Sequence, residues 1–163
     1  MIKLTEVPCE LEGQPLAVLM ANTLRSDYLY HILMAMEEAG VEEPDEILKK
    51  AIYNVGRTWA EKLGQCPTPA DVFAKLVGNP DMKAILKWDC IKEGEEEAEY
   101  HFHRCPLVFG WQRLGLEEEM VKRLCAIGHQ IDYGNVESHG FKLEMHPGLA
   151  QGEEQCVLKV TKT

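Results

Sequence analysis

The sequence has no apolar run that approaches the roughly 20 residues needed to cross a bilayer as a helix. The longest apolar stretch near its start, residues 16–21, is only part of a helical pattern. Residues 1–13 carry acids and an early proline, where a secretory signal would have a basic start and a long apolar centre. We therefore expect a cytoplasmic protein that does not span a membrane.

Positive charge is also scarce. The chain has 17 Lys and Arg residues against 27 Asp and Glu residues, which gives a formal net charge of −10 at pH 7. Such a field repels phosphate backbones and anionic membrane surfaces. We expect the partner to be a small-molecule ligand or substrate, and neither nucleic acid nor a membrane.

Several familiar catalytic motifs are missing from the chain. It has no glycine-rich phosphate loop, no Gly-x-Ser-x-Gly elbow and no His-Glu-x-x-His helix. Its six cysteines are widely spread, and none forms a Cys-x-x-Cys pair. The groups that remain are thiols, imidazoles and carboxylates, which suit hydrolysis by a thiolate nucleophile or by metal-activated water.

The length of 163 residues fits a single domain over residues 1–163, and a chain of this size hides roughly two-thirds of its surface on folding. Its first half, about 1–78, is expected to be helical. Apolar residues recur there at steps of three and four over 15–40 and 44–64. Thr68, Pro69 and Asp71 form a capping-box pattern that predicts a third helix to about residue 77.

The second half, about 79–163, is expected to be α+β and carries most of the cysteines. Residue alternation predicts strands, and helical periodicity predicts two helices between them. The expected order is strands at 82–91 and 98–105, helices at 107–114 and 117–133, and strands at 139–145 and 156–160. The fold class is therefore α+β: N-terminal helices followed by a mainly antiparallel sheet of two hairpins, with helices covering one face.

Two groups of residues could carry chemistry. On the predicted strand, His101, His103 and Cys105 alternate, so they share a face and could bind zinc. The alternative is that the histidines form the solvent-exposed face of the strand. On the long predicted helix, Cys125 and His129 are four residues apart, with Asp132 following one turn later.

Gly128 on the same helix leaves space that Cys125 and His129 could line, although both could instead be ordinary core residues. Cys156 lies on a stripe with Leu158 and Val160, where inert burial is the alternative. Cys9, Cys66 and Cys90 lack a histidine at informative spacing or lie among core residues, and we interpret them as structural.

Several segments resemble one family. These are residues 101–106 (His-Phe-His-Arg-Cys-Pro), residues 111–116 (Trp-Gln-Arg-Leu-Gly-Leu), Cys125 and residues 151–156 (Gln-Gly-Glu-Glu-Gln-Cys), with weaker support from residues 52–57. They resemble proteins like L-2-amino-thiazoline-4-carboxylic acid hydrolase. The layout is also similar to 4-vinyl-reductase-type small-molecule-binding domains of transcriptional sensors, some of which hold zinc.

The resemblance implies that Cys105, Cys125 and Cys156 are the recurring cysteines and candidate zinc ligands, with His103 or His129 completing four-coordination. In the hydrolase pattern an acid follows soon after the helix cysteine, whereas here Gly128-His129 follows and Asp132 comes later.

Two functions follow from these observations. One is hydrolysis of a carbon–nitrogen bond in a small cyclic amide-like or amidine-like substrate, with His103, His129 and Asp132 as catalytic candidates. The other is a small-molecule-binding or sensor-like domain with a structural zinc held by cysteines. A homodimer formed through the helical half is a further prediction.

Overall fold

The computed structural model describes residues 11–163, so Cys9 and most of the acidic N-terminal segment lie outside it. The helices are α1 (Gly13–Glu38), α2 (Pro44–Leu63), α3 (Pro69–Val77), α4 (Pro80–Leu86), α5 (Pro106–Arg113), α6 (Glu118–Gly128) and α7 (Gln130–Ser138), with a 3₁₀ turn η1 (Gly148–Gln151). The strands are β1 (Trp88–Glu93), β2 (Glu97–Phe102), β3 (Phe141–His146) and β4 (Cys156–Lys162).

Within residues 11–163, no helix combines the length and the apolar character that crossing a membrane requires.

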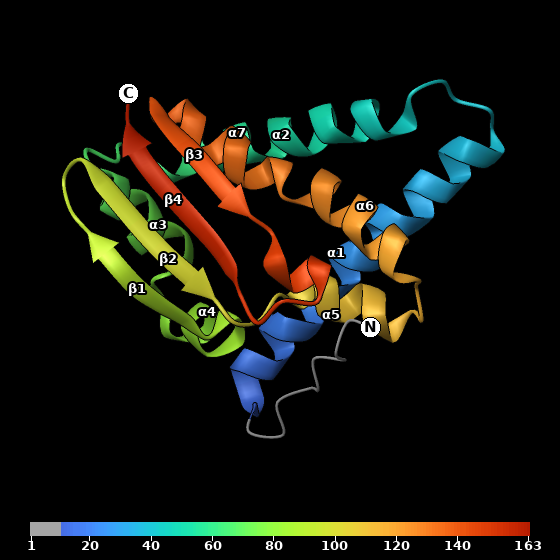
Figure 1. Cartoon of the computed structure of the whole chain (residues 1–163), viewed down its shortest axis with the longest axis horizontal. Coiled ribbons are helices and arrows are strands. Elements are labelled where there is room, and N and C mark those ends of the chain that lie inside the picture. The colour runs from blue at the N-terminus through green and yellow to red at the C-terminus, as the bar shows by residue number, and fades with distance from the viewer. Residues whose placement is uncertain (1–10) are drawn as a thin grey trace.

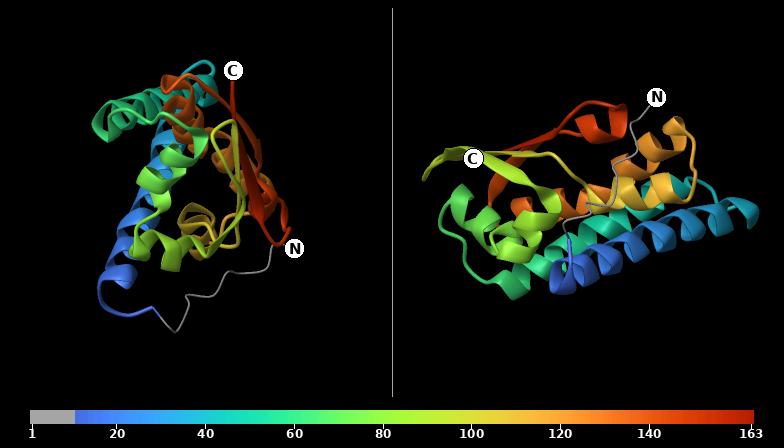
Figure 2. Two further views of the ribbon diagram at one scale, coloured as in Figure 1. Left: turned by 90° about the vertical axis from the view of Figure 1, so that its left-hand side faces the viewer. Right: turned by 90° about the horizontal axis from the view of Figure 1, so that it is seen from below.

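The four strands form one antiparallel sheet in the order β1-β2-β4-β3. Alternate residues of β2 are buried, and they face the helices rather than solvent. The Phe73 ring of α3 packs on the Tyr100 ring of β2, with centroids 4.0 Å apart. The helices lie on one side of the sheet (Figures 1 and 2), so the predicted α+β class is confirmed.

The strand predicted at 82–91 is wrong in its first half, where the chain forms α4. Asn79 caps this helix, because its side-chain oxygen accepts a hydrogen bond from the Met82 backbone N–H at 2.9 Å. Pro80 occupies the first turn, where its missing N–H costs nothing. These helix-start signals override the alternation of apolar residues, and the strand begins only at Trp88.

The single helix predicted at 117–133 is divided in two. The break lies at His129, where the Asp132 N–H donates to the His129 carbonyl at 3.0 Å in a tight three-residue turn. Gly134 and Asn135, expected to end the helix, lie inside α7. Buried apolar residues of α6 pack with α1, α2 and α5, whereas those of α7 pack against the sheet.

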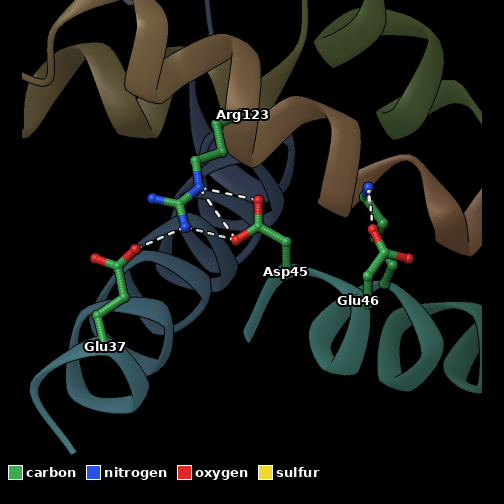
Figure 3. A network of polar contacts seen from close by, with 5 residues as sticks. Glu37, Asp45, Glu46 and Arg123 are labelled. Carbon is green, nitrogen blue, oxygen red and sulfur yellow. Dashed lines mark hydrogen bonds and ion pairs between the residues drawn. The ribbon is translucent and has the colours of Figure 1, made fainter. Parts of the chain in front are cut away.

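A charged cluster connects the first two helices to α6 (Figure 3). Arg123 of α6 donates to both carboxylate oxygens of Asp45 in α2, with its Nε at 3.1 and 2.9 Å from them, and to Glu37 of α1 at 2.6 Å. The Arg123 guanidinium lowers the pKa of the Asp45 carboxyl. The α1–α2 hairpin is thereby held against the C-terminal half of the chain.

Candidate functional site

A cavity of about 210 Å³ lies between the sheet and the helices. This is far more room than one water molecule needs and suits a small organic molecule. Much of its wall is apolar and includes Phe73, Leu86, Phe102, Met145, Leu149 and Leu158. The polar groups on the wall are few, so their chemistry determines what the cavity can do.

Three cysteines from distant parts of the chain line this cavity. Cys105 comes from the N-terminal end of α5, Cys125 from α6 and Cys156 from the start of β4. They lie close enough to affect one another, since ionised Cys105 and Cys156 each raise the pKa of the Cys125 thiol. The structure thus brings together the three thiols that the resemblance singled out.

Cys105 lies at the N-terminal end of α5. Burial raises the pKa of its thiol and outweighs the opposing effects of the Leu107 and Val108 backbone N–H groups, which donate to its sulfur, and of the Arg25 charge. These N–H groups are the ones that favour a thiolate at a helix N-terminus. Burial likewise raises the pKa of Cys156 to about 12 and raises that of Cys125, so each of the three thiols needs a base to take its proton before it can act as a nucleophile.

Asp132 projects from α7 into the same cavity. Burial raises the pKa of its carboxyl to about 7, and the charge of Arg25 only partly opposes this. A carboxylic acid that is still about half protonated at pH 7 can donate a proton to a reacting group. Asp132 is therefore a candidate general acid.

His129 lies at the junction of α6 and α7 and also lines the cavity. Burial lowers the pKa of its imidazole, so the ring is neutral at pH 7. Its Nδ1 is buried and has no hydrogen-bond partner among residues 11–163. A neutral imidazole with an unpartnered nitrogen can accept a proton, which makes His129 a candidate general base.

Asn135 is a cavity residue that the sequence analysis missed. Its side chain is 1% exposed, and neither amide atom has a partner within the described part of the chain. A buried amide without partners is costly, which is consistent with a ligand group that pairs with it. The sequence held no signal for this role, because Gly134-Asn135 is also a common helix end.

His103 is not part of the cavity wall. The strand β2 ends at Phe102, so the prediction that His103 and Cys105 share a strand face is wrong. His103 Nε2 instead lies 2.8 Å from Asp89 Oδ2 at the surface, and His101 Nε2 lies 2.8 Å from Glu99 Oε1. Both histidines therefore fit the alternative interpretation, in which they face solvent.

The zinc set predicted from the sequence is not observed as a coordination group. Among residues 11–163, no three or more His, Cys, Asp or Glu side chains are grouped so that they could hold a metal ion. Cys105, Cys125 and Cys156 share a cavity with His129 without forming such a group, and His103 lies elsewhere.

The sequence profile of one protein family matches residues 20–160, which is nearly the whole chain. That family is described as L-2-amino-thiazoline-4-carboxylic acid hydrolase. The chain belongs to this family. The L-2-amino-thiazoline-4-carboxylic acid hydrolase profile spans every cavity residue discussed above and confirms the resemblance inferred from residues 101–116, Cys125 and residues 151–156.

Among solved structures, the family member is similar to a trafficking protein particle complex subunit 3 from Naegleria fowleri that is covalently bound to palmitic acid. The two share 16% sequence identity over 88% of this chain and 96% of that chain, with a TM-score of 0.57. At this identity the likeness shows a common fold only. No curated protein matches the sequence.

Proposed function

We propose that the protein hydrolyses a carbon–nitrogen bond in a small cyclic amidine-like or amide-like substrate bound in this cavity. The observation that carries the proposal is the meeting of three groups in one largely apolar cavity. These are a thiol at a helix N-terminus (Cys105), an imidazole that is neutral at pH 7 (His129) and a carboxyl that is protonated near neutrality (Asp132). Family membership supports a hydrolase of this general type.

The reaction has two halves. In the first, His129 takes the Cys105 thiol proton, and the sulfur forms a bond to the sp² carbon attached to nitrogen. The electron pair of the carbon–nitrogen bond moves to nitrogen, which leaves after taking a proton from Asp132. In the second half, water attacks the sulfur-bound carbon and gives a proton to the Asp132 carboxylate, while the departing sulfur recovers its proton from His129. One water molecule is consumed, and both side chains return to their starting states.

Asn135 and Arg25 give the substrate its orientation. The Asn135 amide offers a donor and an acceptor side by side, which matches the paired acceptor and donor of an amidine or amide. Arg25 lies at the cavity wall, and its guanidinium donates to Asn22 Oδ1 at 2.9 Å. It is placed to bind an acidic substituent on the substrate.

Matched histidine variants test the proposal, with L-2-amino-thiazoline-4-carboxylic acid as substrate. The wild type should open the ring, giving a product heavier by one water in mass spectrometry. His129→Gln should lower kcat about 100-fold or more, because it removes the general base. His103→Gln should keep wild-type turnover, because that ring faces Asp89 outside the cavity. A wild type that leaves the ring intact, or equal loss in both variants, would contradict the proposal.

A second candidate function is binding of an apolar ligand without turnover. The largely apolar cavity wall favours it, and the similar trafficking-complex subunit holds palmitic acid covalently. Native mass spectrometry of the purified protein would then show a bound apolar molecule, with no hydrolysis of the cyclic substrate. Elemental analysis of protein purified without added metal tests the structural-zinc form of this candidate.

A further inference from the structure

Helix α1 has two apolar faces. One is buried against the rest of the chain and includes Leu19, Leu29 and Leu33. The other is exposed to solvent: Met20, Leu24, Tyr28 and Ile32 are 42%, 49%, 61% and 48% exposed. These four side chains are spaced four residues apart, so they form one continuous stripe along the helix.

Helix α2 carries a matching stripe. Ile47, Val55 and Trp59 are 48%, 40% and 42% exposed, again at multiples of four residues. The Arg25 guanidinium of α1 lies 5.5 Å from the centre of the Trp59 ring, which places the two stripes side by side. We call these seven apolar residues of α1 and α2 the outer hairpin face. Figure 2 shows the hairpin on the side of the molecule away from the sheet.

The outer hairpin face is large enough for a stable interface. Its two aromatic side chains have full areas of about 150–250 Å² each and its five aliphatic ones roughly 60–120 Å² each, so at about half exposure the seven present on the order of 400 Å² of apolar surface. A standard interface buries about 800 Å² per partner, of which somewhat more than half is apolar. The largest apolar patch on a typical monomer is about 300–600 Å² and is often functional. The exposed surface of this face therefore matches the apolar part of one dimer interface.

The distribution of charge indicates that a second copy of this chain covers the outer hairpin face. Two chains of net charge −10 repel each other over most of their surfaces. Residues 13–36 of α1 contain one acid, Asp27, and one base, Arg25, so repulsion is weakest where these helices meet. We propose that the outer hairpin face is the interface of a homodimer, in which the hairpins of two copies pack around a two-fold axis.

The same interface would close the cavity. Of the described residues that line it, only Arg25 and Trp59 are exposed, and both lie at the outer hairpin face. A partner chain on this face covers the point where the cavity wall reaches the surface. The dimer thus limits access of solvent to Cys105 without contributing to its chemistry.

Analytical ultracentrifugation tests the interface independently of any hydrolysis. At about 10–100 µM the wild type should sediment as a dimer, with twice the 18.5 kDa mass of one chain. Tyr28→Glu and Ile32→Glu, made separately, should each yield folded monomers. Ile91→Glu is the matched control, because Ile91 is 55% exposed on β1, far along the chain from the hairpin, and should stay dimeric. A monomeric wild type, or dimers in both hairpin variants, would overturn the proposal.

Alkylation of Cys105 by iodoacetamide, followed by peptide mass spectrometry, tests the closure. The rate should rise several-fold in Tyr28→Glu over the wild type and stay unchanged in Ile91→Glu. Circular dichroism establishes that Tyr28→Glu is folded, so that a faster rate reports an open cavity and not an unfolded chain. A rate that is equal in the dimer and the folded monomer would contradict the closure of the cavity.

Discussion

In this cavity the pKa of the Asp132 carboxyl is higher than that of the His129 imidazole, which reverses the usual order. In water a carboxyl releases its proton well below the pH at which imidazole does. Burial raises the pKa of Asp132 to about 7 and lowers that of His129. At a pH between these two pKa values, the Asp132 carboxyl is protonated and the His129 imidazole is neutral. This arrangement holds an acid and a base ready in one cavity near neutral pH.

The pH dependence of kcat/KM follows from this reversal. We expect a bell-shaped profile, because turnover needs neutral His129 and protonated Asp132. The rising limb should lie below pH 6.5, and the falling limb near pH 7. In Asp132→Asn the falling limb should disappear, along with most of the rate. An unchanged profile in Asp132→Asn would exclude this carboxyl as the acid.

Stability provides a control that does not depend on activity. The pKa of Asp132 is raised on folding from 3.8 to about 7, so its contribution to stability is fully present below about pH 3.8 and is lost as pH rises through 7. In urea unfolding, the difference in free energy between Asp132→Asn and wild type should therefore shift in favour of the variant as the pH rises from 4 to 8. No pH dependence in this difference would show that the carboxyl is not buried.

At the scale of elements, the crossing of α2 and α7 positions the polar wall of the cavity. A Cβ on Gly56 would lie 2.1 Å from the Ile131 carbonyl oxygen, and one on Gly134 would lie 2.0 Å from the Tyr53 carbonyl oxygen. The two backbones therefore pack more closely than any side chain allows. Asp132 and Asn135 lie on the part of α7 that this contact holds.

Gly56→Ala should destabilise the protein by about 2–3 kcal/mol, since overpacking outweighs the roughly 1 kcal/mol that alanine gains over glycine in a helix. Gly128→Ala is the matched control, because its Cβ would meet side chains and no backbone: Leu107 at 3.3 Å, Trp111 at 3.4 Å and Leu29 at 3.7 Å. It should change the free energy of unfolding by less than about 1 kcal/mol. Equal stability of the two variants in urea unfolding would contradict the close crossing.

The same elements show what the sequence could and could not predict. Helical periodicity and the Thr68 capping box located the first three helices, because these signals are local. The α4 segment was misassigned because its alternating apolar residues hid the Asn79 cap, and the break at His129 was missed because helical periodicity continues across Gly128. The grouping of Cys105 with Cys125 was predictable only through the family resemblance.

At the scale of the whole molecule, the α1–α2 hairpin, the later helices and the sheet all contribute residues to the cavity wall. Figure 1 shows how these elements are arranged around one another. Residues from both halves of the chain pack together in the two main core clusters. Asn135 and Arg25 could not be assigned to the site from sequence, because their placement depends on how distant helices cross. Cys105 is the residue through which we propose that this cavity reacts.

The most direct test of that claim is kcat for ring opening in Cys105→Ser, compared with Cys90→Ser. Cys90 is exposed on β1 and serves as a matched control for loss of a thiol. We predict that Cys105→Ser lowers kcat by about 1,000-fold or more with the fold retained, whereas Cys90→Ser leaves it unchanged. Wild-type turnover in folded Cys105→Ser would contradict the account.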